Sequence, residues 1–236
     1  MKKMIIASTS TVHGSEYLEY ILPTLSNFFN GVESILFIPY ARPGGLSYDG
    51  YTKNARNVFK KIDLPVKGIH EFDDPKLAIK NAKAIFTGGG NTFELVNQLH
   101  KNNLLDVLKE VLLQGVPYLG TSAGSNICGV NMMNTNDMPI VYPPSFNTLG
   151  MIPFNINAHY LDPNSDSTHM GETRETRIKE FHVFNDLSVL GLREGSWLEV
   201  TGEKITLRGN LTGRWFQKDK KPIEIETNNL VNDFIN

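Results

Sequence analysis

One serine of this chain lies in a cramped corner, within the residues VPYLGTSAG of Val116–Gly124. Ser122 follows a short apolar run and has Gly120 and Gly124 two positions away on either side, which matches the G-x-S-x-G pattern of a nucleophile elbow. In such an elbow a strand turns at once into a helix, so the flanking residues must be small and the hydroxyl is held outward. The motif alone leaves a second interpretation open, in which Ser122 only caps the helix.

A second glycine-rich stretch, GGGN, ends another apolar run and precedes a helical pattern. It lacks the glycine spacing of dinucleotide sites and the G-K-[ST] of phosphate loops. The backbone N–H of Gly89 or Gly90 would complete an oxyanion hole with that of Ala123, because distant strand ends meet at one edge of a parallel sheet. The alternative is a plain helix start capped by Asn91 or Thr92.

A nucleophilic serine needs a base, and a base needs an acid to orient it. His159 ends the strand-like run NINAHY, whereas the other histidines lie in helices, in loops or near the chain start: His13, His70, His100, His169 and His182. Two acids are candidates by position, Asp137 just past the elbow helix and Glu194 at the end of a strand. The Cys, His and acidic residues lack zinc-site spacing, so we expect no metal.

Length and composition bound the class of protein. The chain has 236 residues, 40% hydrophobic and 20% charged, with a formal net charge of −2. This balance predicts a soluble protein without a nucleic-acid partner, since such partners normally require a basic stripe. Its apolar runs fall short of the roughly 20 residues of a membrane span, and MIIAS near the start is typical of a strand rather than a signal peptide. The lone Cys128 indicates a reducing, cytoplasmic location.

Short apolar runs alternate with helical patterns in the first half of the chain. Strands are predicted at 4–8, 34–40, 66–70, 84–90 and 116–120, and helices at 15–31, 51–62, 74–82, 91–103 and 104–115. Asp74 is the expected N-cap of one helix, with Pro75 at its first position. This alternation predicts an α/β fold with a mostly parallel sheet and helices on both faces, whose site lies at the carboxyl ends of the strands.

The second half has a different pattern. Residues 131–170 are rich in proline and asparagine and predict loops with one strand near MIPFNINAHY, followed by a helix at 171–184. From Ser188 onward, alternating residues with turns at TGEK and GNLTG predict antiparallel hairpins. We therefore expect one α/β domain over 1–236.

Several motifs together resemble the peptidase E family of α-aspartyl dipeptidases: GGGNTF, GTSAGSN, TNDMPIV, NAHY, GETRETRI and GLREGSWL. They occur in the family's order and at similar spacings over nearly the whole chain. The resemblance implies a cytoplasmic serine peptidase with no metal or organic cofactor, on a class I glutamine amidotransferase-like fold. Its substrates would be small peptides with an N-terminal aspartate.

The resemblance also implies roles for single residues. Ser122 would be the nucleophile and His159 the base. Glu194 and Asp137 both match positions assigned to the third member of the triad; we favour Glu194, with Asp137 binding the substrate's α-ammonium or supporting the site. Arg174, within GETR, would bind the aspartyl carboxylate, although it also fits a solvated helix face of alternating charges.

Two rival functions remain open at this point. A cyanophycinase-like peptidase would cleave β-aspartyl–arginine bonds by the same serine chemistry, but would need an acidic pocket that the sequence does not indicate. A non-catalytic binder of small acidic peptides would be expected to lack the nucleophile or the base, and both are present. The sequence leaves a monomer and a homodimer equally open.

Overall fold

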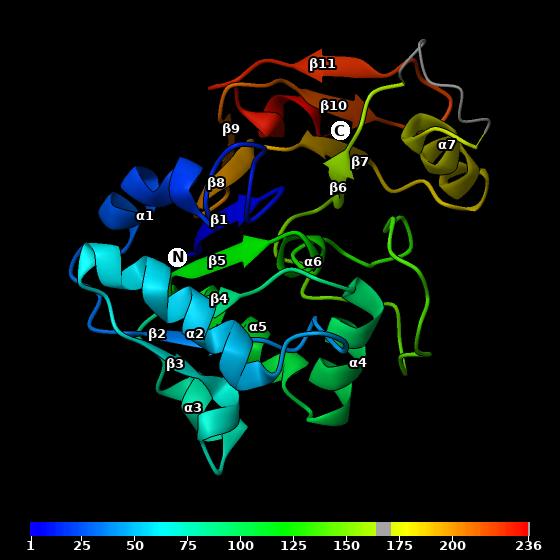
Figure 1. Ribbon diagram of the computed structural model, residues 1–236. Coiled ribbons are helices and arrows are strands. Elements are labelled where there is room, and N and C mark those ends of the chain that lie inside the picture. The colour runs from blue at the N-terminus through cyan, green and yellow to red at the C-terminus, as the bar shows by residue number, and fades with distance from the viewer. Residues whose placement is uncertain (164–170, 236) are drawn as a thin grey trace.

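The predicted strands of the first half form one large sheet in the computed structural model, which describes residues 1–163 and 171–235 (Figure 1). The sheet has seven strands in the order β3-β2-β4-β5-β1-β8-β9. Its members are β1 (Lys3–Ala7), β2 (Ile35–Ile38), β3 (Val66–Gly68), β4 (Ile85–Thr87), β5 (Tyr118–Thr121), β8 (Trp197–Thr201) and β9 (Lys204–Arg208). The first five are parallel to one another, and β8 and β9 are antiparallel, so the expected α/β sheet is confirmed.

Helices cover both faces of this sheet. The helical elements of the first half are η1 (Glu19–Ile21), α1 (Leu22–Phe28), α2 (Tyr48–Phe59), η2 (Lys60–Ile62), η3 (Ile69–Glu71), α3 (Pro75–Lys80), α4 (Thr92–Lys101) and α5 (Leu105–Gln114). Because side chains alternate along a strand, Ile5 of β1 packs with α1 and α2, whereas Met4 and Ile6 pack with α3, α4 and α5. The central strands are therefore buried on both sides.

Two helix starts follow their sequence signals. Asp74 caps α3, since its carboxylate accepts the N–H of Lys76 at 2.9 Å and that of Leu77 at 3.0 Å, and Pro75 is the first helical residue. Asn91 caps α4 in the same way by accepting the N–H of Glu94 at 3.1 Å. The α4 cap places the triglycine stretch immediately before the helix.

The helix predicted at 15–31 is wrong in extent. The chain there forms only η1 and the short α1, and Leu18 has a positive φ of 57°. Pro23 lies in the first turn of α1, where its missing N–H costs nothing. Further inside a helix its ring would collide with the carbonyl of Glu19, which explains why no continuous helix runs through it.

The second half of the chain builds a smaller sheet with the strand order β11-β10-β7-β6. Its elements, with the remaining helices, are α6 (Ala123–Asn126), β6 (Asn155–Tyr160), α7 (Arg174–Phe184), β7 (Val189–Arg193), β10 (Gly213–Phe216), β11 (Ile223–Ile225) and η4 (Val231–Phe234). β6 and β7 are parallel, and β10 is antiparallel to both β7 and β11. Trp215 and Ile225 of this sheet belong to the same buried cluster as Met4 of the large sheet.

The hairpin expected at GNLTG is also wrong. The turn at TGEK joins β8 to β9 as an antiparallel hairpin, but β9 and β10 belong to different sheets. The chain crosses between the sheets three times, after β5, after β7 and after β9. The last two crossings lie against each other, since a Cβ on Gly209 would lie 2.6 Å from the carbonyl oxygen of Gly195. An alternating pattern shows which face of a strand is buried, but not which strand pairs with it.

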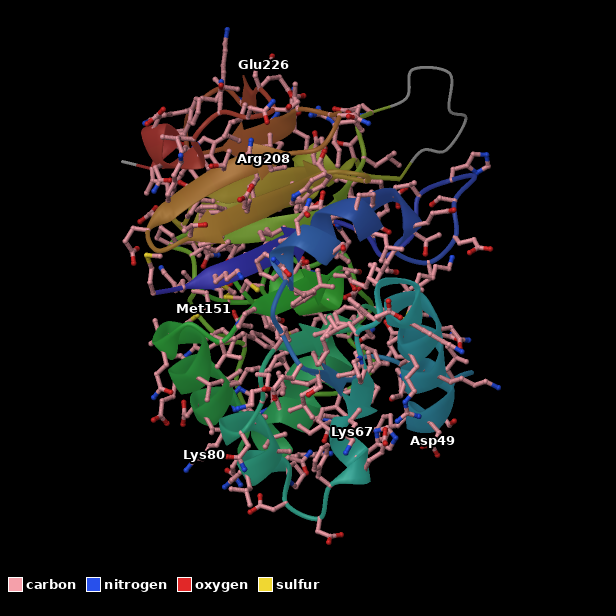
Figure 2. All side chains as sticks on the ribbon, turned by 90° about the vertical axis from the view of Figure 1, so that its left-hand side faces the viewer. Asp49, Lys67, Lys80, Met151, Arg208 and Glu226 are labelled. Carbon is pink, nitrogen blue, oxygen red and sulfur yellow. The ribbon has the colours of Figure 1, made fainter. Side chains whose placement is uncertain are left out.

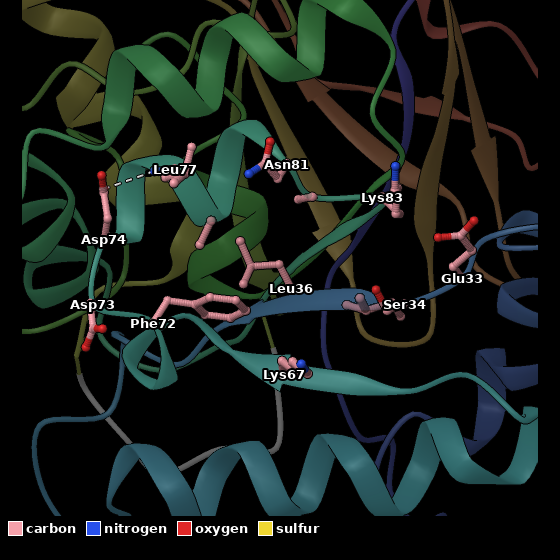
Figure 3. A pocket seen from close by; sticks show the side chains of 13 residues that line it. Glu33, Ser34, Leu36, Lys67, Phe72, Asp73, Asp74, Leu77, Asn81 and Lys83 are labelled. Atoms are coloured by element: carbon pink, nitrogen blue, oxygen red, sulfur yellow. Dashed lines mark hydrogen bonds between the residues drawn. The ribbon is translucent and has the colours of Figure 1, made fainter.

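One cavity lies far from the predicted chemistry. It has a volume of about 500 Å³ and lies between α3 and the strands β2 and β3, with Leu36, Lys67, Phe72 and Leu77 among its walls (Figure 3). In Figure 2, Lys67 and Lys80 lie at the opposite end of the molecule from Arg208 and the smaller sheet. None of the lining residues was predicted to bind or react, and the cavity takes no part in the site below.

Candidate active site

Ser122 forms the sharp turn that its sequence predicts. It directly follows β5 and precedes α6, with φ 52° and ψ −111°, which is a strained conformation for a residue with a side chain. Gly120 and Gly124 have no room for a Cβ, because it would meet the backbone of Gly124 and of Thr87, respectively. The Ser122 side chain makes no capping hydrogen bond to α6. The capping interpretation is therefore wrong, and the hydroxyl is free for another partner.

That partner is His159. The hydroxyl oxygen of Ser122 lies 3.2 Å from Nε2 of His159, although 37 residues separate them in the chain. On the other side of the ring, Nδ1 lies 3.7 Å from Oε1 of Glu194, which is an ion-pair distance but too long for a direct hydrogen bond. Catalytic hydrogen bonds are often long without substrate and shorten when it binds. The side chain of His159 therefore lies between those of Ser122 and Glu194.

The environment of His159 favours its neutral form. Burial is the main cause that lowers its pKa below the ordinary 6.5, and the positive charge of Arg174 lowers it further. The negative charges of Glu194 and Asp137 oppose this shift without cancelling it. A neutral imidazole has one ring nitrogen without a proton, and Nε2 is the nitrogen that faces the Ser122 hydroxyl.

Asp137 lies near His159 but is held by other groups. Its Oδ2 accepts the N–H of Thr92, at the start of α4, at 2.7 Å and the hydroxyl of Thr135 at 3.2 Å. Its charge acts on both His159 and Arg174. Oδ1 has no hydrogen-bond partner in the part of the chain that the structure describes. The hydrogen bonds to Oδ2 therefore hold the carboxylate of Asp137 in place.

The segment that carries Asp137 is bound to β6 by asparagine side chains. We call residues 131–137 the asparagine segment. Asn157 of β6 donates to the carbonyl of Asn134 at 2.9 Å, and Asn136 donates to Oδ1 of Asn157 at 2.9 Å. Asn134 donates in turn to the backbone of Ile156 at 3.0 Å. These hydrogen bonds of asparagine amides hold Asp137 beside the strand that carries His159.

Arg174 is the first residue of α7 and is half-buried. Burial and the charge of Arg177 lower its pKa, and the negative charge of Asp137 raises it. An arginine remains protonated under such shifts, so the site holds a fixed cation within electrostatic reach of His159. Arg177, one turn further along α7, is exposed and lies 4.0 Å from Glu172.

A network of ion pairs lies behind Glu194 and Arg174. Its members are Asp162, Glu175, Arg193, Arg214 and Glu224. Arg193 precedes Glu194 in the chain, and Glu175 follows Arg174. Arg193 is 2.7 Å from Asp162 and 2.8 Å from Glu224, while Arg214 joins Glu224 and Glu175, each at 2.9 Å. We call this set the ion-pair network. It connects β7, β10, β11 and α7 with Asp162, which lies two residues beyond β6.

The expected oxyanion donors lie beside the serine. A Cβ on Gly89 would lie 2.9 Å from the Cβ of Ser122, so this glycine lies directly against the serine. Gly90 has φ +143°, a conformation open to glycine but rarely to other residues. Within the described residues, the N–H groups of Gly89, Gly90 and Ala123 donate to no other group. They are available to an oxyanion.

Two further observations concern what the described residues lack. Among residues 1–163 and 171–235, no three His, Cys, Asp or Glu side chains are grouped so that they could hold a metal ion. In the same residues no helix is long and apolar enough to cross a membrane. His169, one of the histidines named in the sequence, lies outside the described residues.

Sequence reasoning missed the residues that hold the site together. Tyr51 and Asn157 donate to backbone carbonyls far away in the chain. The N–H of Thr92 and the hydroxyl of Thr135 both donate to the carboxylate of Asp137. The repeated asparagines of NMMNTND and NIN were a usable signal, because buried amides need partners. No local pattern pointed to Tyr51.

A strained serine beside a neutral histidine, at the carboxyl edge of a parallel sheet, is the arrangement of a serine-dependent hydrolase. The comparisons with known proteins narrow this class. The sequence model of peptidase family S51 matches residues 4–208. The chain therefore belongs to peptidase family S51.

Relatives and solved structures agree with this assignment. The chain is 43% identical to the peptidase E of Streptomyces coelicolor over 98% of this chain and 94% of that protein. It is also 43% identical to a probable alpha-aspartyl dipeptidase of Drosophila melanogaster, over 92% of this chain and 91% of that protein. A solved peptidase from an acI-B1 Actinobacterium has the same fold, with a TM-score of 0.71, 16% identity, and coverage of 98% and 96%. The resemblance drawn from the motifs and the expected serine-type peptidase class are confirmed.

Proposed function

We propose that this serine peptidase is a dipeptidase that releases aspartate from Asp-Xaa peptides. The observation that carries the proposal is the 3.2 Å approach of the Ser122 hydroxyl to Nε2 of a neutral His159, at a strained elbow beside free backbone N–H groups. The names of the relatives, peptidase E and alpha-aspartyl dipeptidase, support the substrate class.

The first half of the reaction forms an acyl-enzyme. His159 takes the proton of Ser122 as the hydroxyl oxygen attacks the carbonyl carbon of the aspartyl residue. The resulting oxyanion accepts hydrogen bonds from the N–H groups of Gly90 and Ala123, with that of Gly89 nearby. When the tetrahedral intermediate collapses, His159 gives its proton to the leaving amine, and the C–N bond breaks.

The second half releases aspartate. A water molecule loses its proton to His159 and attacks the same carbonyl carbon. Collapse of this second intermediate breaks the bond to Ser122, which takes the proton back. Glu194 holds the imidazole in the orientation that both halves need and stabilises its charged form, as triad acids do.

Specificity for aspartate requires a cation and an anion at fixed places. Arg174 binds the side-chain carboxylate of the substrate, because a desolvated carboxylate needs a charge with hydrogen bonds in place of its lost water. Asp137 binds the α-ammonium through Oδ1, which has no partner within the described residues. A glutamyl substrate is one methylene longer, and a rigid guanidinium would then hold its carbonyl away from Ser122.

Assays of the wild type and of Ser122→Ala with four peptides test the proposal. The wild type is expected to hydrolyse Asp-Leu but not Glu-Leu, N-acetyl-Asp-Leu or β-Asp-Arg. Ser122→Ala is expected to lose about 10⁶ of kcat with unchanged folding, as for other triad nucleophiles. Hydrolysis of β-Asp-Arg instead of Asp-Leu would favour the cyanophycinase-like activity. Binding of Asp-Leu without turnover by the wild type would favour the non-catalytic binder.

We also infer a cytoplasmic location, supported by the single cysteine of the chain, Cys128, which is free and buried. Cell fractionation tests this location, and recovery of the protein outside the cytoplasm would contradict it. The state of assembly, monomer or homodimer, is decided by light scattering of the purified chain.

A further inference from the structure

The triglycine loop lies between the nucleophile and a buried tyrosine. On one side, a Cβ on Gly89 would lie 2.9 Å from the Cβ of Ser122. On the other side, a Cβ on Gly88 would lie 2.5 Å from the hydroxyl oxygen of Tyr51, which belongs to α2. Both glycines therefore let the loop fit between Ser122 and Tyr51.

The two ends of this loop are held by backbone groups. The N–H of Gly88 donates to the carbonyl of Ile38 at 3.2 Å, and the N–H of Asn91 donates to the carbonyl of Ala41 at 2.7 Å. Between these anchors, the carbonyl of Gly89 accepts the hydroxyl of Tyr51 at 3.0 Å in buried surroundings. In the described part of the chain, Tyr51 is the side chain that holds the middle of the loop.

The bond to Gly89 also sets the direction of the next N–H group. A peptide unit is planar and trans, so the carbonyl of Gly89 and the N–H of Gly90 point in opposite directions. A hydroxyl that fixes the carbonyl therefore fixes the N–H as well. Glycine has no side chain to limit its rotation, and this peptide has a glycine on each side, so it would turn easily without the bond.

Tyr51 is itself a rigid donor. It is 2% exposed, its ring lies 4.9 Å from that of Phe37 at 90°, and the guanidinium of Arg42 lies 5.3 Å from the ring centre. Burial raises the pKa of Tyr51, so the hydroxyl keeps its proton over the working pH range. The packing of its ring thus holds Tyr51 in place, and its raised pKa keeps the hydroxyl a hydrogen-bond donor.

We propose that Tyr51 is a positioning residue that aims the N–H of Gly90 at the oxyanion formed on the substrate. The proposal rests on the serine mechanism described above. Tyr51 touches neither the substrate nor Ser122, and acts through the Gly89–Gly90 peptide. The other donor, the N–H of Ala123, needs no such support, because the elbow itself fixes it.

Tyr51→Phe tests this role by removing one hydroxyl and keeping the ring. The kcat for Asp-Leu is expected to fall about tenfold or more, yet by less than the roughly 10²–10³ that follows removal of an oxyanion donor. KM is expected to stay nearly unchanged, because the donor acts on the charge that develops in the transition state.

Thr148→Val is the matched control. Thr148 also donates a buried hydroxyl to a glycine carbonyl, that of Gly129 at 2.7 Å, and no part of the mechanism uses it. Both variants are expected to lower the melting temperature, and only Tyr51→Phe is expected to lower kcat. If both variants keep the wild-type kcat, Tyr51 is merely structural and the proposal is wrong.

A measurement without substrate separates this proposal from the proposed function. ¹⁵N relaxation of Gly89 and Gly90 is expected to show a more mobile peptide in Tyr51→Phe than in the wild type and in Thr148→Val. Equal mobility in all three proteins would overturn the positioning role. Failure of the wild type to hydrolyse Asp-Leu would instead count against the proposed function, and relaxation would still decide the role of Tyr51.

Discussion

The two sides of His159 are built from different interactions. On one side, the asparagine segment is bound to β6 by neutral amide groups, and Asn157 of β6, which takes part in these hydrogen bonds, is 1% exposed. On the other side, the ion-pair network lies behind Glu194 and Arg174, with side chains between 13% and 51% exposed. Neutral buried bonds are insensitive to salt and pH, whereas partly exposed ion pairs respond to both. The contacts of the asparagine segment should therefore persist when salt or pH changes, whereas those of the ion-pair network should weaken.

The difference matches what each side would do in catalysis. Asp137, on the neutral side, is already held through Oδ2 by Thr92 and Thr135 and would bind an ammonium without rearrangement. Glu194, on the charged side, lies 3.7 Å from Nδ1 of His159 and would have to approach it to act as the proposed triad acid.

The largest expected effect separates the two acids. Glu194→Gln is expected to lower kcat by roughly 10²–10⁴, as losses of triad acids do, and to leave KM nearly unchanged. Asp137→Asn is expected to act mainly through KM, because it weakens binding of the ammonium. Steady-state kinetics on Asp-Leu measure both effects. The reverse pattern would make Asp137 the third member of the triad.

The next effect tests whether Arg174, on the side of the ion-pair network, binds the aspartyl side chain of the substrate. Arg174→Ala is expected to lose at least about tenfold in kcat/KM on Asp-Leu, because a hydrogen bond to a charged group contributes roughly 1.5–3 kcal/mol. Any trace of activity on Ala-Leu should survive. Arg177→Ala, on the same helix, is the control and should be milder. Equal losses on both substrates would mean that Arg174 only supports α7.

A third experiment compares how the asparagine segment and the ion-pair network contribute to the free energy of unfolding. Asn157→Ala is expected to reduce the free energy of unfolding by about 1–3 kcal/mol, since it leaves buried partners unsatisfied. That loss should be the same in low and high salt. The loss from Arg193→Met should shrink as salt rises, because added ions screen the pairs it breaks. Urea unfolding at two ionic strengths measures this, and identical salt dependence in the two variants would contradict the contrast.

The smallest effect is a shift in pH dependence. Activity requires neutral His159, so kcat/KM should fall as pH drops through its pKa, which burial and Arg174 hold below the ordinary 6.5. Arg174→Ala removes a positive charge and should move this acid limb to higher pH. Asp137→Asn removes a negative charge and should move the limb to lower pH. Shifts of the same sign in both variants would show that the limb reports another group.

The sequence predicted the parts of the fold that local chemistry controls. The apolar strands, the Asp74 cap and the small residues around Ser122 each follow from nearby residues, and the parallel sheet follows from their alternation. The extent of α1 and the crossing between β9 and β10 were missed, because one depends on Pro23 and the other on which sheet offers a partner.

The site shows the same division. Ser122 could be named from its motif and His159 from its place at the end of a strand-like run, and Glu194 and Asp137 from their positions and the family resemblance. Tyr51 and Asn157 could not, since a tyrosine or an asparagine has many ordinary uses and these bind backbone groups 38 and 23 residues away. Candidate site residues are recognisable in the sequence, whereas the residues that hold them in place require the structure.

The cysteine count of the chain has a practical consequence. Cys128, the one cysteine, is fully buried, and burial raises the pKa of its thiol, so alkylating reagents should pass it by. Ser122→Cys would therefore give a protein with one reactive thiol, beside His159. Iodoacetamide labelling could then count intact active sites in a preparation, and a fluorophore attached there would report substrate entry without any background from the rest of the chain.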